Sequence, residues 1–188
     1  MKNGNSKSQL RSLNRAAHRV FGDLFSIGEP LPINSISGDE LSNCDPTDGL
    51  AKFVQNFQMV ICPVLRHEHL MCTFTMLKEG SSWGLHSFTY GTSTESQVLF
   101  SQVAECKKTI GHTDFRLIDF NSLNRQCLSY NTPAGLRLYC LRYWPNDPDL
   151  IRRSRDPIVL LNFFKEEWAR KKKMIDENTS SDLVGGSS

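Results

Sequence analysis

Apolar side chains recur at helical spacing in three segments of the chain. In residues 8–27 they lie three or four residues apart and form one stripe, while basic residues occupy the opposite side. Residues 94–111 show the same periodicity. Residues 156–174 begin with Asp156-Pro157, a pair typical of a helix start, and continue with several apolar turns. We therefore expect one basic amphipathic helix at the N-terminus and two helices in the folded part.

Strand-like patterns fill most of the chain between these helices. They are rich in β-branched and aromatic residues and are separated by turn residues. The predicted strands cover residues 53–64, 69–77, 83–90, 115–120, 126–130 and 136–144. The order of elements predicts an α+β fold, with a mainly antiparallel sheet of about five or six strands packed with two or three helices.

The distribution of polar residues predicts three regions. Residues 1–49 combine the basic helix with a Pro/Ser-rich connection over 28–49, which we expect to run along the surface. Residues 50–175 contain most of the apolar positions and form the predicted globular α+β domain. Residues 176–188 are polar and are predicted to be a disordered tail.

Charge is segregated along the chain, although the net charge is only +2. Residues 1–19 carry +5, residues 20–151 carry −5, and residues 152–173 carry +5. Basic ends around an acidic middle favour a polyanionic partner, either an anionic lipid surface or RNA and ribonucleoprotein. The candidate binding residues are Arg11, Arg15, Arg19, Arg152, Arg153, Arg155, Arg170, Lys171, Lys172 and Lys173.

Each basic segment has more than one interpretation. The N-terminal helix could lie in a lipid headgroup layer or bind nucleic-acid phosphates. It could equally dock on its own core through its apolar stripe. The run 170–173 is also typical of a nuclear localisation signal. A stacking and phosphate-binding surface for RNA could also form in or beside the strand 136–144, from Arg137, Tyr139, Arg142, Tyr143 and Trp144 with Arg152, Arg153 and Arg155. Alternating burial of this strand in the core is the stronger interpretation.

The cluster with the clearest metal-ligand chemistry consists of Cys62, His67, His69 and Cys72, because zinc accepts two sulfurs and two imidazoles. The cluster lacks a CxxC pair, and only His67 falls at the predicted hairpin tip. We expect core cysteines and solvent-exposed histidines, and predict no metal and no cofactor.

No catalytic motif is present, so the chain is predicted not to be an enzyme and no small-molecule substrate is identified. A cysteine beside His86 or His112 in a deep pocket would favour an enzyme instead. The six cysteines lie mostly in apolar runs, and no apolar run is long enough to span a membrane. We also expect no secretory signal, because the first residues contain no apolar run before a small-residue cleavage site. These features predict an intracellular protein, cytoplasmic or nuclear, that can associate with membranes or virions.

The arrangement resembles that of the small matrix proteins of rhabdoviruses, including plant-infecting ones. The resemblance rests on the basic arm ending at Arg19, the motif Pro30-Leu31-Pro32, and the segments FQMVICPVL at 57–65 and LRLYCLRYW at 136–144. It implies a structural protein whose compact α+β domain binds membrane and nucleocapsid. We therefore expect a non-enzymatic assembly or adaptor protein, capable of self-association. An RNA-binding protein, such as a viral silencing suppressor, and an enzyme without a recognisable motif remain the alternatives.

Overall fold

The computed structural model describes Arg15, Leu50 and residues 26–46, 57–80, 82–89, 94–111, 114–142 and 144–184. The chain divides into two compact units, one from residues 1–34 with 56–117 and the other from 35–55 with 118–188. The helix predicted over residues 8–27 lies largely outside the described residues. Arg15 is helical, and the last two residues of that segment form a strand.

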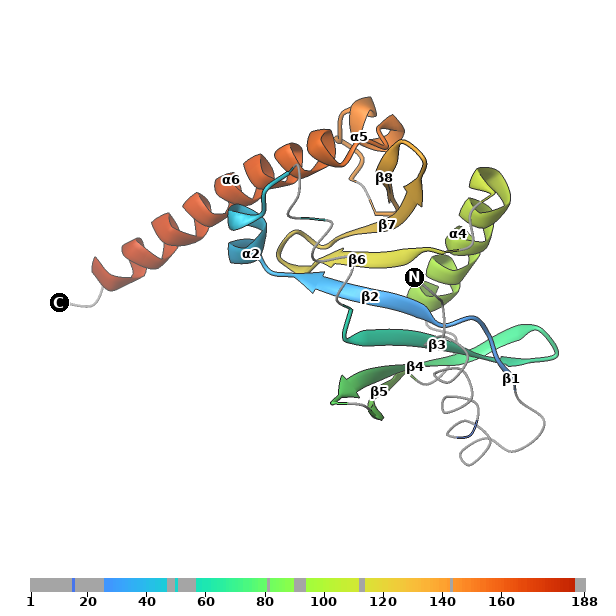
Figure 1. The fold of residues 1–188 in the computed structure, drawn as a ribbon. Coiled ribbons are helices and arrows are strands. Elements are labelled where there is room, and N and C mark those ends of the chain that lie inside the picture. Colours follow the sequence, from blue (N-terminus) through green and yellow to red (C-terminus); the bar gives the residue numbers. More distant parts are fainter. Residues whose placement is uncertain are drawn as a thin grey trace. The chain divides into compact units, whose positions relative to one another are not determined.

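The described residues contain an eight-stranded mixed sheet and four α-helices (Figure 1). Hydrogen-bonded strands follow the order β5-β4-β3-β2-β6-β7-β8, and β1 pairs with β3. The strands are β1 Ser26–Ile27, β2 Leu31–Ile36, β3 Met59–Arg66, β4 His69–Glu79, β5 Ser82–Thr89, β6 Arg116–Phe120, β7 Arg125–Thr132 and β8 Gly135–Cys140. The helices are α2 Gly38–Asn43, α4 Thr94–Ile110, α5 Asp149–Arg153 and α6 Pro157–Val184, and a 3₁₀ turn covers Asn121–Leu123. The α+β class is confirmed, but the predicted strand count is too low and the sheet is mixed.

Two strands were not predicted: β1 lies at the end of the segment predicted as a helix, and β2 lies in the segment that we expected to be a surface connection. β2 pairs antiparallel with β3, and Leu31, Pro32 and Ile33 face Ile61, Val60 and Met59 in the register. Its sequence LPINSI contains a proline and two polar residues, so its own pattern does not predict a strand. The segment forms a strand because it pairs with β3, about 30 residues further along the chain.

Helix α2 follows β2 directly and starts with a capping box. The backbone N–H of Ser37 donates to Oε2 of Glu40 at 2.8 Å, and the backbone N–H of Glu40 donates to Oγ of Ser37 at 3.3 Å. The Ser-x-x-Glu spacing is visible in the sequence, but the six-residue helix behind it has too few apolar positions to show a helical period.

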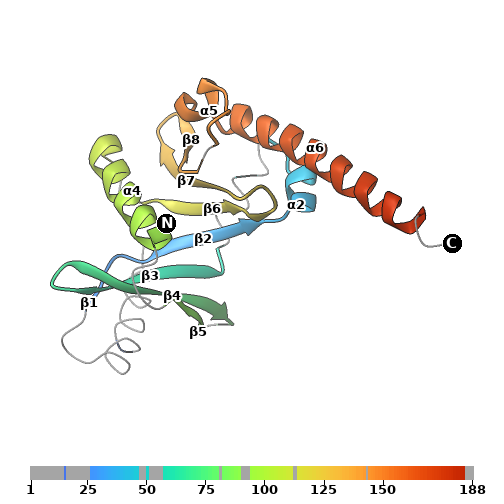
Figure 2. The same cartoon turned by 180° about the vertical axis from the view of Figure 1, so that it is seen from behind.

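The first unit contains the strands β3, β4 and β5, which follow one another as an antiparallel meander, and helix α4 (Figure 2). His67 and Glu68 have φ values of 48° and 67° and form the two-residue turn between β3 and β4, where the hairpin tip was predicted. The core of this unit consists of Val60, Cys62, Val64, Cys72, Phe74 and Met76.

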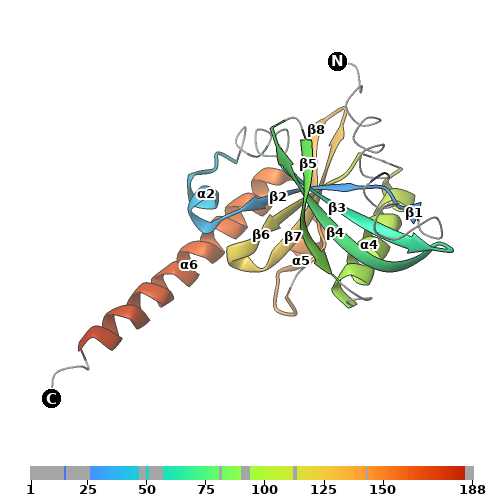
Figure 3. The same cartoon turned by 90° about the horizontal axis from the view of Figure 1, so that it is seen from below.

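The second unit is built around α6, which packs against β8 and α2 (Figure 3). The carboxylate of Asp156 accepts a hydrogen bond from the backbone N–H of Ile158 at 2.9 Å, as expected for the predicted helix start. The side chains of α6 that are buried in the core are Leu160, Leu161 and Phe164. The helix continues past its predicted end at residue 174 to Val184, so most of the predicted disordered tail is helical. The three-region division itself stays a prediction.

Candidate functional site

The ten predicted binding residues are distributed between described and undescribed parts of the chain. Arg11 and Arg19 lie outside the described residues, whereas Arg15 is exposed. The other seven lie on α5, on the turn that follows it, or on α6. The structure therefore describes one basic surface, in the second unit, and the following paragraphs call these seven residues the α5–α6 basic surface.

The part of this surface on α6 consists of exposed residues. Every residue from 169 to 178 is exposed, and Figure 3 shows these turns continuing beyond α2. Lys172 lies 3.4 Å from a carboxylate oxygen of Asp39, and Lys173 lies 3.8 Å from one of Glu177. Arg170 and Lys171 instead donate to the backbone carbonyls of Glu166 and Ser122. Two of the four cations thus have carboxylate partners, in exposed pairs of the kind that contribute about 0–1 kcal/mol.

The part near α5 contains both exposed and half-buried arginines. Arg153 is 81% exposed on its side chain and forms an i,i+4 pair with Asp149 at 3.4 Å. Arg152 is exposed and reaches the carbonyl oxygen of Pro145 at 3.4 Å. Arg155 is half-buried, donates to the carbonyls of Arg152 and Ser154, and its guanidinium lies 4.2 Å from the ring centroid of Tyr139. Arg155 therefore acts in packing.

The contact with Arg155 also bears on the aromatic surface considered for RNA. Tyr139 is half-buried under Arg155, and its neighbours Leu138 and Cys140 are buried. Tyr143 lies outside the described residues. Trp144 is 41% exposed and Leu150 is 57% exposed, so exposed apolar side chains flank the α5 arginines. The interpretation of strand 136–144 as alternating core residues therefore agrees with the described part of that segment.

A buried arginine next to this surface was not predicted. Arg125, at the start of β7, is 1% exposed, and its guanidinium binds two carboxylates. Nη1 and Nη2 donate to both oxygens of Asp147 at 2.6 and 2.7 Å. Nε and Nη2 donate to Glu167 at 2.6 and 3.0 Å. These partners lie 22 and 42 residues away in sequence, so no local signal identifies the triad.

The triad contains two acids that lie close in sequence to the basic surface. Asp147 lies in the loop before α5, and Glu167 lies on α6 three residues before Arg170. Arg125 pairs with both carboxylates and offsets one of their two negative charges, so the triad keeps a net charge of −1. Burial opposes the charged form of Arg125, but its hydrogen bonds to the two carboxylates outweigh burial and raise its pKa. The segment from Trp144 to Lys173 contains eight Lys and Arg side chains and five acids. Two of these acids, Asp147 and Glu167, are engaged by Arg125, which offsets one further negative charge.

The pKa of Asp147 predicts an acid-dependent loss of stability. Burial alone would raise this pKa, but hydrogen bonds from Arg125 and from the backbone N–H of Trp144 outweigh burial and lower it. The stabilisation is expected to be complete above about pH 4, the usual pKa of an unfolded aspartate, and to be lost as the pH falls through the lower folded-state pKa. Urea unfolding between about pH 5 and pH 2 should show a steeper loss in the wild type than in Asp147→Asn.

A second carboxylate, Asp119, also contributes to the pH dependence of stability, but equally in both proteins. Burial raises its pKa, so its contribution to stability has the opposite slope with pH. Because Asp119 is present in both proteins, its contribution cancels in the difference between them. Parallel stability curves for the wild type and Asp147→Asn would contradict the predicted role of Asp147.

The structure does not bring the candidate zinc ligands together. Cys62 and Cys72 are buried in the core of the first unit, whereas His67 and His69 are exposed at the hairpin turn. The cysteines are diagonal neighbours, because Cys62 pairs with Phe74 and Val64 pairs with Cys72. They do not face one another directly, because the turn is centred between His67 and Glu68 and the register shifts again between Val64 and Leu65. Burial raises the pKa of Cys62 to about 12, which keeps the sulfur protonated.

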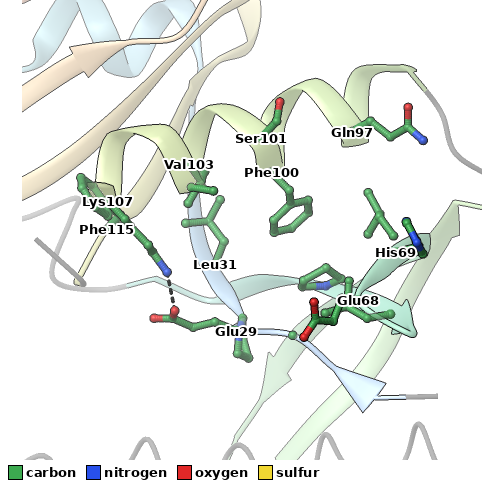
Figure 4. A pocket seen from close by; sticks show the side chains of 16 residues that line it. Glu29, Leu31, Glu68, His69, Gln97, Phe100, Ser101, Val103, Lys107 and Phe115 are labelled. Atoms are coloured by element: carbon green, nitrogen blue, oxygen red, sulfur yellow. Dashed lines mark hydrogen bonds and ion pairs between the residues drawn. The ribbon is translucent and has the colours of Figure 1, made fainter. Parts of the chain in front are cut away.

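A groove of about 430 Å³ lies between α4, the β3–β4 hairpin and the segment that leads into β2 (Figure 4). Phe100 and Val103 of α4 point into it toward Leu31. An ion pair between Lys107 and Glu29 borders one end. The described lining can therefore hold an apolar group.

The same lining offers little for nucleophilic catalysis. It contains His69 but no cysteine, and the hydroxyl of Ser101 is hydrogen-bonded to the carbonyl of Val98 at 2.9 Å. His86 is exposed on β5, and His112 lies outside the described residues. All six cysteines are buried thiols that form no disulfide. The cysteine–histidine site that would favour an enzyme is not formed by the described residues.

Comparisons with protein-family models, curated protein sequences and solved structures found no match to this chain. Among the helices of the described segments, none combines the length and apolar character required to cross a membrane.

Proposed function

We propose that this chain is a non-enzymatic assembly or adaptor protein that binds anionic membrane surfaces through the α5–α6 basic surface. The observation that carries the proposal is the exposed run Arg170–Lys173, with Arg152 and Arg153, close in sequence to two acids that are paired with Arg125. A matrix-type role in assembly, as in the family that the sequence resembles, is part of the same proposal.

Anionic lipid can replace the carboxylate partners of the exposed basic side chains at little energetic cost. The exposed pairs with Asp39, Asp149 and Glu177 contribute about 0–1 kcal/mol each. A basic side chain near an anionic leaflet contributes about 1 kcal/mol. Several such residues acting together can therefore hold the protein on a charged surface without breaking any buried interaction.

Lipid is favoured over RNA by the side chains next to the arginines. Trp144 and Leu150 are exposed on the segment that leads to Arg152 and Arg153. Aromatic and aliphatic side chains flanked by basic residues are typical of proteins that lie in the membrane–water interface. Within the described residues, the aromatic ring on β8 that RNA stacking would use is covered by Arg155.

Co-sedimentation with vesicles tests this function on the full chain. Vesicles of phosphatidylcholine with phosphatidylserine are expected to bind the wild type, and phosphatidylcholine alone is expected not to. The variant Arg153→Gln, Arg170→Gln, Lys173→Gln should bind the anionic vesicles roughly a hundredfold more weakly, since three side chains contribute about 1 kcal/mol each.

A matched control removes the same charge from the first unit. Arg66→Gln, Lys78→Gln, Lys108→Gln changes three exposed residues and should bind nearly as well as the wild type. Equal weakening in the two variants would mean that only net charge matters and would reject the α5–α6 basic surface. Equal binding of both vesicle types would reject anionic lipid, and salt-dependent binding of single-stranded RNA without vesicle binding would support the RNA alternative instead.

A further inference from the structure

Strand β5 ends the strand order of the sheet, and in the described residues it pairs only with β4 (Figures 1 and 2). An edge strand offers unpaired backbone groups to another chain, and natural edges are usually protected by charged residues or proline. The sequence of β5, SWGLHSFT, contains no Asp, Glu, Lys, Arg or Pro. An irregularity of the pairing between Thr75–Ser87 and Met76–Leu85 is the protective feature that the described residues show.

An apolar row of the sheet ends in solvent at this edge. Val60 of β3 pairs with Met76 of β4, and Met76 pairs with Leu85 of β5. Val60 and Met76 are both buried, at 4% exposure each, whereas Leu85 is 62% exposed. A further strand beside β5 would cover Leu85 and continue the row.

We propose that β5 is a self-association edge, which pairs antiparallel with β5 of a second copy of this chain. Antiparallel pairing of identical strands is two-fold symmetric, so each copy supplies the same backbone donors and acceptors. Because the strand has no charged side chain, this pairing opposes no like charges in any register. The net charge of +2 also gives little long-range repulsion between copies.

The size of the contact determines how strong the association is. One pair of eight-residue strands gives a smaller contact than the roughly 1,600 Å² of a standard stable interface. The dimer is therefore weak and dependent on concentration. This inference does not depend on membrane binding, because β5 belongs to the first unit and the α5–α6 basic surface to the second.

Sedimentation velocity over a range of concentrations tests the proposal. The wild type is expected to shift from monomer to dimer as its concentration rises, and Leu85→Lys is expected to stay monomeric because it places a charge in the apolar row. Val98→Lys, at an exposed apolar position on α4, is the matched control and should behave like the wild type. A wild type that is monomeric throughout, or a Leu85→Lys variant that still dimerises, overturns the proposal.

Hydrogen exchange on the wild type gives a second test that needs no substitution. Backbone amides of residues 82–89 should exchange more slowly at high than at low protein concentration. Amides of β3, which has strands on both sides, should be unaffected. Protection of β5 that does not change with concentration overturns the proposal even if Leu85→Lys fails to fold. Vesicle binding is measured separately, so failure of one proposal leaves the other standing.

Discussion

Replacing Arg125 with methionine is expected to lower the free energy of unfolding by about 3–5 kcal/mol, because it leaves two carboxylates without their cation. Asp147 is 6% exposed on its side chain and loses both hydrogen bonds from the guanidinium. Glu167 is more exposed and can recover some hydration. Urea unfolding followed by circular dichroism at about pH 7 measures the change.

A triple variant separates the charge from the packing of the arginine. Arg125 also packs over the rings of Phe163 and Phe164, with its guanidinium carbon 5.6 Å from each centroid. Arg125→Met with Asp147→Asn and Glu167→Gln removes the unpaired charges while methionine keeps part of the apolar contact. It should recover much of the lost stability. A triple variant as unstable as Arg125→Met would mean that packing, not charge, is what Arg125 supplies.

Truncation of Phe164 to alanine should be about as damaging, at 3–5 kcal/mol. Phe164 has no exposed surface, and its ring centroid lies 4.9 Å from that of Phe120 on β6. Alanine would leave a cavity where α6 meets the sheet, beside the guanidinium of Arg125. The measurement is again the urea midpoint, together with loss of the near-ultraviolet signal of the packed aromatic rings.

Ile158→Ala on the same helix provides the control for Phe164→Ala. Ile158 is 43% exposed in the first turn of α6, so its truncation should cost well under half as much. If the two substitutions proved equally destabilising, general helix propensity would explain the loss and the proposed anchoring of α6 by Phe164 would be wrong.

The structural roles of Arg125 and Phe164 also affect how the vesicle experiment should be interpreted. Arg125 and Phe164 hold α6 and the loop before α5 on the core of the second unit. A substitution at either one can reduce lipid binding by unfolding the support of the basic surface. The glutamine variants proposed for the binding test avoid this because Arg153, Arg170 and Lys173 are exposed.

The elements that were predicted well are those whose own residues contain the signal. Helix α4 has its period within 17 residues, and the start of α6 follows from Asp156-Pro157 and the apolar turn behind it. The β3–β4 hairpin was placed by two strand-like runs around a polar tip. In each case the apolar pattern and the turn residues are local and can be read without knowledge of the partner elements.

The candidate site was only partly predictable for the same reason. The sequence shows that Arg170 to Lys173 are clustered. It does not show that Arg155 packs on Tyr139 whereas Arg153 faces solvent, because this difference depends on side-chain contacts. The exposed apolar end of the row at Leu85 is likewise defined by register with β4. Sequence pattern alone describes Leu85 as one apolar residue among several in a strand.

The sequence by itself determined the α+β class, the positions of its longer helices and hairpin, and the segregation of charge toward the ends. Only the tertiary structure decided that the Pro/Ser-rich connection contains strand β2, that Arg125 is buried between Asp147 and Glu167, and that β5 forms an edge. The physical reason is distance along the chain. Helical period and turn chemistry depend on neighbouring residues, whereas strand pairing and buried ion pairs join residues tens of positions apart, and their energies appear only once the chain has folded.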